Sequence, residues 1–326
     1  MNNSDLKNRS SDDELNFYDP NYRPKKESSS EDPGVFDSPK SIYEYLDSHV
    51  YSHALYKKAL ALFIWKHING HKSGALLVAG SSGSGKTEMI RALSRLYKNI
   101  HVADGASLVP TGFKGNTSLA THLSSLDFLD EKYPPVLVID EFDKLVFRSK
   151  SYSWNDTGLI AELLKFIEGG SFNIGNTDNP KYIDTTGLGV ILLGSFSALS
   201  EHPSSIPIGF SADIRKKSSV NNPLKQEQII EQFPAELQGR ISSIVVLDEL
   251  TEDDFYNLLK DDRYSPIARL CRDYGLNMTV SEEKYHEIAH DAFISKTGVR
   301  KMNSIVSAYL DEQLFSDHTI KNLSIE

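Results

Sequence analysis

The sequence predicts an α/β fold, in which a parallel sheet lies between helices and a small helical domain follows. Short apolar runs with the composition of buried parallel strands occur at residues 75–79, 100–103, 136–139, 190–193 and 244–247. Amphipathic helical patterns separate these runs, and this alternation is typical of a sheet covered by helices on both faces. After residue 250 the pattern is helical only, down to about residue 314.

Three regions follow from this pattern. Residues 1–37 are rich in Asn, Ser, Asp, Glu, Lys and Pro. Such a stretch buries too little apolar surface to offset chain entropy, so we expect a disordered polar tail, either a solubilising leader or a docking segment for an adaptor. Residues 38–247 are predicted to form the large α/β domain, and residues 248–326 the small helical domain.

The composition restricts the partners of the chain. Its 326 residues carry a net charge of −10, which gives no bulk basic field for nucleic acid or an anionic membrane. The single cysteine, Cys271, excludes internal disulfides and Cys-based zinc clusters and fits a reducing cytosol. No apolar stretch approaches the ~18–20 residues of a membrane span, and the N-terminus lacks the pattern of a signal peptide. We expect a cytoplasmic protein that binds neither nucleic acid nor membranes.

A glycine-rich segment follows the first predicted strand and fits the phosphate-loop pattern G-x-x-x-x-G-K-[ST] without a mismatch. Its residues, the predicted ATP-binding set, are Gly80, Ser81, Ser82, Gly83, Ser84, Gly85, Lys86 and Thr87. Between a strand and a helix, bare backbone N–H groups can surround a phosphate chain. Lys86 is expected to reach the β- and γ-phosphates, and the Thr87 hydroxyl to hold Mg²⁺.

A second nucleotide signature begins at residue 136, where an apolar strand ends in two acids, Asp140 and Glu141. Asp140 is expected to bind the Mg²⁺ shell, and Glu141 to orient and polarise the attacking water. Paired acids after a strand also occur where a helix N-terminus favours negative charge. The phosphate loop upstream favours the catalytic interpretation, so the sequence predicts an ATPase.

Two further segments resemble a known family. Ile139-Asp-Glu-Phe-Asp-Lys144 and Leu163-Leu-Lys-Phe-Ile-Glu-Gly169 are similar to AAA+ unfoldases of the ClpX and HslU type, with ClpX the nearer. The likeness runs from about residue 38 to 314. It implies an AAA+ ATPase domain with a helical lid, in a homo-oligomer, a hexamer in that family, which pulls protein substrates through a central pore.

The resemblance also carries roles for individual residues. Phe113 takes the place of the pore-loop aromatic that grips substrate, in the segment Gly112, Phe113, Lys114 and Gly115. Arg240 matches the arginine finger supplied to a neighbouring subunit, and Arg300 matches the sensor-2 arginine of the small domain. Residues 190–199 resemble the strand leading to the sensor-1 region, and residues 144–158, with Arg148 and Lys150, would correspond to a second pore loop.

One tripeptide bears on a partner. Ile208-Gly209-Phe210 occupies the loop that ClpX uses to dock onto the peptidase ClpP, although an apolar loop can also pack on its own domain.

Other features depart from the family. The four-cysteine zinc domain is missing from this sequence, and Tyr51-Ser52-His53 replaces an Ile-Gly-Gln element near the adenine pocket.

A competing motif lies in the small domain, where residues 286–290 satisfy the zinc pattern H-E-x-x-H. Tyr285, Ile288, Ala289, Ala292 and Phe293 give this segment the buried stripe of an ordinary amphipathic helix, so we expect a helix surface without metal.

The sequence therefore leaves two functional hypotheses open. The first is an ATP-dependent ring-forming unfoldase, with delivery to a ClpP-type peptidase as an open extension. The alternative is an AAA+ remodeller of protein complexes, or a nucleotide-gated scaffold, with no peptidase partner. The sequence identifies no substrate.

Overall fold

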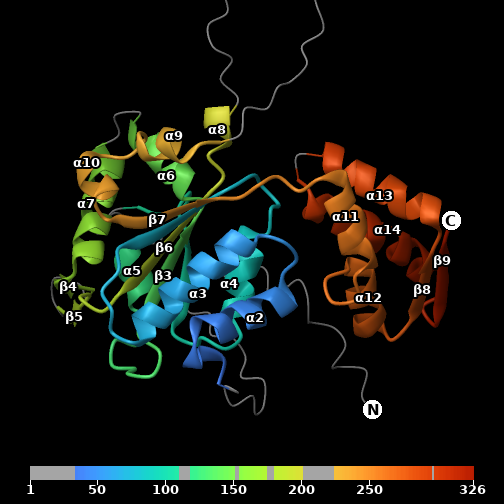
Figure 1. The fold of residues 1–326 in the computed structure, drawn as a ribbon, viewed down its shortest axis with the longest axis horizontal. Coiled ribbons are helices and arrows are strands. Elements are labelled where there is room, and N and C mark those ends of the chain that lie inside the picture. Colours follow the sequence, from blue (N-terminus) through green and yellow to red (C-terminus); the bar gives the residue numbers. More distant parts are fainter. Residues whose placement is uncertain (1–33, 110–117, 151–153, 175–179, 201–223, 296) are drawn as a thin grey trace, which may run out of the picture.

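The fold was taken from a computed structural model, which describes residues 34–109, 118–150, 154–174, 180–200, 224–295 and 297–326. In these residues the chain forms two lobes (Figure 1). The sheet lobe comprises the elements from η1 to β7, and the helical lobe those from α11 to β9. No helix in the described ranges is long and apolar enough to span a membrane.

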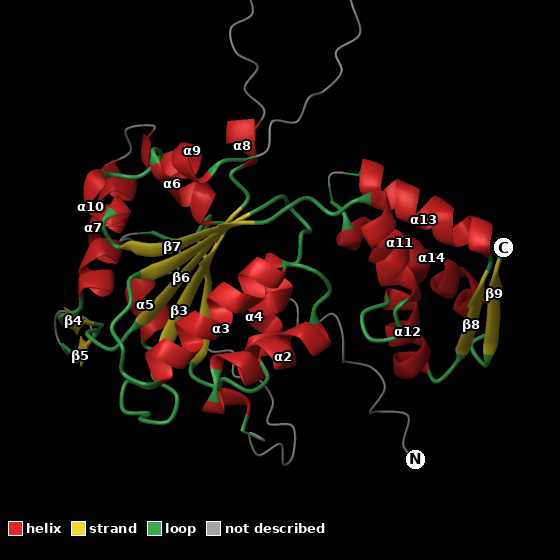
Figure 2. Ribbon diagram, viewed as in Figure 1, coloured by secondary structure: helices red, strands yellow, loops and turns green. Residues whose placement is uncertain are grey.

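The sheet lobe is built on a parallel sheet with the strand order β2-β3-β6-β1-β7. Its strands are β1 (Ala75–Ala79), β2 (Ile100–Asp104), β3 (Val136–Asp140), β6 (Gly189–Gly194) and β7 (Ile241–Val246). The predicted α/β class is therefore confirmed (Figure 2). Strand β7 begins three residues earlier than predicted, because its first half carries the polar Ser242 and Ser243 and lacks an apolar run.

Helices cover both faces of the sheet, because alternate strand residues point to opposite sides. Leu76 and Val78 of β1 belong to the core on one face, and Ala75, Leu77 and Ala79 to the core on the other. The first core is closed by η1 (Val35–Asp37), α2 (Pro39–His49), α3 (Ala54–Ile68) and α4 (Lys86–Ser94). The second is closed by α5 (Leu119–Leu123), α6 (Phe142–Lys150), α7 (Trp154–Glu168), α9 (Gln226–Ile230) and α10 (Ala235–Gln238).

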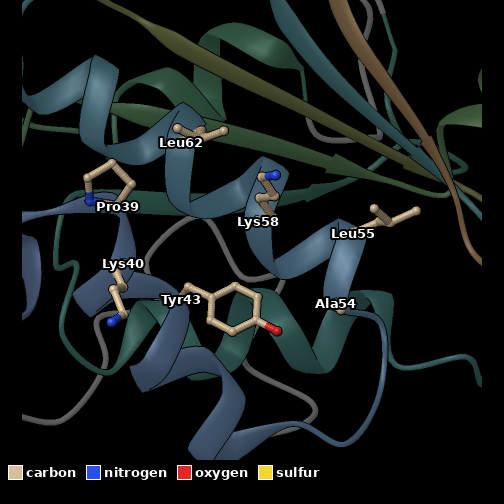
Figure 3. A pocket seen from close by; sticks show the side chains of 7 residues that line it. All are labelled: Pro39, Lys40, Tyr43, Ala54, Leu55, Lys58 and Leu62. Atoms are coloured by element: carbon tan, nitrogen blue, oxygen red, sulfur yellow. The ribbon is translucent and has the colours of Figure 1, made fainter.

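Smaller elements lie at the margins of this sheet. Strands β4 (Ser171–Asn173) and β5 (Tyr182–Asp184) form an antiparallel pair after α7, and α8 (Ser197–Ser200) follows β6. A surface groove of about 410 Å³ lies between α2 and α3, where Tyr43, Leu55 and Leu62 form part of its wall (Figure 3). None of the residues that line it belongs to the predicted ATP-binding set.

The helical lobe contains α11 (Glu252–Lys260), α12 (Pro266–Tyr274), α13 (Glu282–Ile294) and α14 (Val299–Ser316). The expectation of a purely helical pattern was wrong here, since β8 (Asn277–Val280) and β9 (Asn322–Ile325) form a parallel pair. In β9, Leu323 and Ile325 are buried and the residues between them are exposed, as in a half-buried strand. The lobe packs around its own apolar clusters, which include Phe255, Ile288 and Met302.

The two lobes meet at the end of α2 and in the segment that links α2 to α3. The Tyr264 hydroxyl of the helical lobe donates to the backbone carbonyl of Asp47. The Tyr51 hydroxyl donates to Asp254 Oδ1 at 3.3 Å, and the Tyr51 and Tyr264 rings meet edge to face with centroids 5.7 Å apart. This segment is therefore bonded directly to the helical lobe.

A buried histidine pair joins β2 to α5. His101 Nε2 lies 2.8 Å from His122 Nδ1, and both rings are almost fully buried. His122 Nε2 has no hydrogen-bond partner. Burial lowers the pKa of His122 to about 4, because the cationic ring is poorly solvated there.

The pKa of His122 predicts how stability depends on pH. The folded state resists protonation of His122, so its contribution is complete above pH ~6.5 and is lost as pH falls toward ~4. This loss amounts to about 3 kcal/mol, at roughly 1.4 kcal/mol per pKa unit. Urea unfolding at several pH values gives the free energy of unfolding as a function of pH. Between pH ~6.5 and ~4 this free energy should fall less for His122→Gln than for the wild type. An equal fall in the two proteins would contradict the assignment.

Candidate nucleotide site

The glycine-rich segment forms the turn between β1 and α4, as the sequence predicts. Gly83 and Gly85 have φ values of 75° and 90°, a backbone region that side chains disfavour, and Gly85 caps the N-terminus of α4. Lys86 is the first residue of the helix. The turn therefore has the local geometry of an anion site, with a helix N-terminus at its base.

Lys86 folds back over this turn. Its Nζ donates to the Gly80 carbonyl at 2.6 Å and to the Ser81 carbonyl at 2.8 Å, and the side chain is buried. Burial lowers the pKa of Lys86 to about 8, and the positive charge of Arg300 acts in the same direction, while Asp140 opposes it. Lys86 thus lies within the loop, and charged residues of both lobes shift its pKa.

The two predicted Mg²⁺ ligands lie together. Thr87 Oγ1 donates to Asp140 Oδ2 at 2.6 Å, which joins the start of α4 to the end of β3. Asp140 is buried, with 6% of its surface exposed. A hydroxyl and a carboxylate are oxygen ligands of the kind that Mg²⁺ prefers, so this donor set fits the ion.

Glu141 has a strained backbone. Its φ of 53° lies in the left-handed region, which is rare for residues other than glycine and is often found at functional sites. Its Oε2 accepts a hydrogen bond from Lys144 Nζ at 2.5 Å, and this bond is the main reason for the raised pKa of Lys144. The neighbouring Gly105 permits the turn, because a Cβ there would lie 2.8 Å from the Asp140 carbonyl oxygen.

Asp143 connects the ends of two strands. Its buried carboxylate accepts hydrogen bonds from the Ser195 hydroxyl at 2.8 Å, the Ser195 N–H at 3.1 Å and the Phe196 N–H at 3.2 Å. Ser195 follows β6 directly and falls in the region that resembles sensor 1. No sequence motif singles out this serine, although a polar residue at the C-terminal end of a buried strand is a usable signal.

The helical lobe contacts the phosphate loop through its backbone. A Cβ on Gly83 would lie 2.2 Å from the Thr297 carbonyl oxygen, so only glycine allows this approach. Arg300 is the second residue of α14, three positions after Thr297. The structure therefore brings Arg300 to the same end of the sheet as Lys86.

Arg240 is not brought to this site. Its carbonyl accepts the N–H of Ala75, the first residue of β1, whereas the phosphate loop follows the last residue of that strand. A strand of this length spans roughly 17 Å, at about 3.3 Å per residue. The Arg240 guanidinium instead donates to Glu168 Oε1 at 2.7 Å, with about half of each side chain exposed. Arg240 and the phosphate loop thus lie at opposite ends of β1.

Several predicted residues lie outside the described part of the chain. These are the pore-loop segment Gly112, Phe113, Lys114 and Gly115, and the docking segment Ile208, Gly209 and Phe210. Arg148 is described, and the expectation that it belongs to a pore loop was wrong. It lies in α6, and its guanidinium donates to the carbonyls of Ala106 and Leu108, which precede the pore-loop segment.

The H-E-x-x-H segment forms part of α13. The His286 ring stacks on Tyr256 with centroids 4.5 Å apart, and His290 Nδ1 lies 3.2 Å from Glu252 Oε2. In the residues that the structure covers, no three His, Cys, Asp or Glu side chains form a potential metal site. The predicted stripe is correct for Ile288, Ala289 and Ala292 but wrong for Phe293, which is 49% exposed at the edge of the helix.

Comparisons with known proteins agree with this geometry. Residues 76–194, which span β1 to β6, match the family described as "ATPase family associated with various cellular activities (AAA)". The ATP-dependent Clp protease ATP-binding subunit ClpX of Treponema denticola is 28% identical, with 88% of this chain and 79% of that protein covered. The chain is a ClpX-like AAA+ ATPase.

A second relative gives the same result. The protein named ATP-dependent Clp protease ATP-binding subunit ClpX 2, from Wolinella succinogenes, is 28% identical, with 85% of this chain and 77% of that protein covered. Both matches cover far more of the chain than the AAA region, and at these coverages they must reach into the helical lobe.

Proposed function

We propose that this ClpX-like ATPase is a ring-forming protein unfoldase that threads polypeptides through a central pore. Ring assembly is supported by the position of Arg240, which lies at the end of β1 opposite to the phosphate loop of its own chain. An arginine placed there reaches a nucleotide only on a neighbouring copy. The likeness to ClpX over most of the chain supports protein as the substrate.

Within each subunit, ATP is the substrate of the phosphate loop. Residues 80–87 would hold its phosphates through backbone N–H groups and the Lys86 ammonium, and Thr87 and Asp140 would hold Mg²⁺. Bound Mg²⁺ supplies charge neutralisation on the phosphate oxygens. Glu141, half-exposed next to Asp140 in the chain, would orient the attacking water and accept its proton.

Assembly would complete the site. Arg240 of one copy would stabilise charge on the phosphoryl group bound to the next copy, and Arg300 would report nucleotide state to the helical lobe. We propose residues 38–247 and 248–326 as the two domains that move relative to each other, residues 1–37 as a tail, and a cytoplasmic hexamer as the assembly.

Threading can be tested with Phe113, whose mutation separates unfolding from hydrolysis. We expect Phe113→Ala to retain ATPase activity near that of the wild type and to lose at least tenfold in the rate of unfolding a fluorescent protein fused to an unstructured tail (an order-of-magnitude estimate for a lost aromatic contact). Phe113→Tyr, which retains the ring, is the matched control. Unchanged unfolding by Phe113→Ala would favour the remodeller or scaffold.

The names of the two relatives, which are ATP-binding subunits of a Clp protease, support a peptidase partner. Ile208, Gly209 and Phe210 are the proposed docking residues. Binding of a ClpP-type peptidase that is lost in Phe210→Ala would support delivery to that partner. If no peptidase binds the wild-type chain, an unfoldase without a peptidase remains the proposal.

A further inference from the structure

The N-terminal turn of α3 contacts the phosphate loop through a side chain that the motifs do not include. His53 Nε2 lies 2.6 Å from the carbonyl oxygen of Ser84, between the two glycines with positive φ. A carbonyl oxygen only accepts hydrogen bonds, so Nε2 carries the proton and donates. Burial lowers the pKa of His53, so at neutral pH the ring is uncharged and has one N–H, the one used here.

The backbone that presents His53 is strained. Ser52 and His53 have φ values of 60° and 58°, and two consecutive left-handed residues other than glycine are costly. His53 is also the N-cap residue of α3, yet its side chain makes no capping bond to the helix. The strained turn therefore serves the bond to Ser84 and not the start of the helix.

A second bond from the same turn acts on the same loop. The hydroxyl of Tyr56, which is fully buried, donates to the Lys86 carbonyl at 3.2 Å. The first turn of α3 thus holds the carbonyl groups on both sides of Gly85. Just upstream of this turn, Asp47 at the end of α2 and Tyr51 in the link to α3 are bonded to the helical lobe.

Peptide geometry gives these bonds a consequence. The described residues contain no cis peptide bond, and in a trans peptide the C=O and the N–H of the same plane point in opposite directions. The C=O of Ser84 shares its plane with the N–H of Gly85. Holding that carbonyl on His53 directs the Gly85 N–H away from α3. Without the bond, the plane beside a glycine is free to rotate, because glycine accepts most backbone angles.

We propose that His53 is a positioning residue for ATP binding, which holds the Ser84 carbonyl so that the Gly85 N–H faces the triphosphate. The inference rests on ATP as the ligand in the proposed function, but it requires neither a ring nor a protein substrate. It predicts a role in binding phosphates, not in binding the adenine base.

The test compares the wild type with His53→Gly and His53→Gln. Glycine removes the donor and accepts the left-handed φ without strain, so the backbone turn is retained, and a thermal unfolding curve of each variant checks that it is folded. Glutamine retains an N–H donor of similar reach. A fluorescent ATP analogue with Mg²⁺ measures affinity, and inorganic triphosphate displaces it as a probe that contacts the loop alone.

We expect His53→Gly to weaken both ATP and inorganic triphosphate by about tenfold, the upper range for one lost hydrogen bond. His53→Gln should recover affinity to within about threefold. At saturating ATP, His53→Gly should hydrolyse near the wild-type rate, with the change confined to KM.

Three results would overturn the proposal. In the first, His53→Gly binds triphosphate as tightly as the wild type. In the second, the loss affects ATP but spares triphosphate, which would place His53 at the base. In the third, His53→Gln is no better than His53→Gly. The nucleotide titration does not depend on unfolding of a substrate protein. It therefore tests the role of His53 even if Phe113→Ala does not impair threading.

Discussion

ATP hydrolysis by Glu141→Gln is expected to fall by about 10²–10⁴-fold, the usual contribution of a positioned general base. Glutamine preserves the size of the side chain but cannot accept the proton of the attacking water. ATP binding should remain close to that of the wild type, because the phosphates are held by residues 80–87. The measurement pairs steady-state phosphate release with a nucleotide titration on the same preparation.

A matched control separates this role from the ion pair that Glu141 makes. Lys144→Gln removes the partner at 2.5 Å but leaves the carboxylate in place, so its hydrolysis rate should change by only a few-fold. If Lys144→Gln is as inactive as Glu141→Gln, the pair is required as a unit. If Glu141→Gln hydrolyses at the wild-type rate, another residue activates the water.

Arg240→Ala is expected to lose about 10³–10⁵-fold in hydrolysis, the range for removal of an arginine finger. In the wild type, activity should appear only at protein concentrations where sedimentation shows a ring-sized species. Since Arg240 also bonds Glu168, the control is Glu168→Gln, which removes that exposed ion pair and should change the rate by only a few-fold.

Mixing the two inactive variants tests whether Arg240 acts on a neighbour. In a mixed ring, some sites combine Glu141 from an Arg240→Ala subunit with Arg240 from a Glu141→Gln subunit, and hydrolysis should partly return. An arginine acting within its own chain would give no recovery. A wild-type monomer that hydrolyses ATP as fast as the oligomer would exclude the ring mechanism.

The features that could be predicted from the sequence are those encoded in short contiguous segments. Strands β1, β3 and β6 are buried on both sides, so they appear as apolar runs, and the phosphate loop is defined by contiguous residues. Four-residue strands such as β8 and β9 give too little pattern to be recognised, and each forms only with a partner far along the chain.

The parts that were missed depend on distant contacts. His53 and Ser84 are 31 residues apart, and no spacing rule joins an imidazole to a loop carbonyl. Arg148 was assigned to a pore loop from the family resemblance, but its position on α6 directs it to the carbonyls of Ala106 and Leu108. Phe293 fitted the helical period, yet it lies at the C-terminal end of α13 and is half-exposed.

The close approach of Thr297 to Gly83 has a consequence for how the protein is made. A ribosome completes residue 83 long before it reaches residue 297, so the phosphate loop emerges without the backbone that finally packs against it. Until the helical lobe has folded, that surface of the loop remains open to water and to other proteins. The nucleotide site is therefore among the last parts of the nascent chain to reach its finished form, although its sequence is synthesised early.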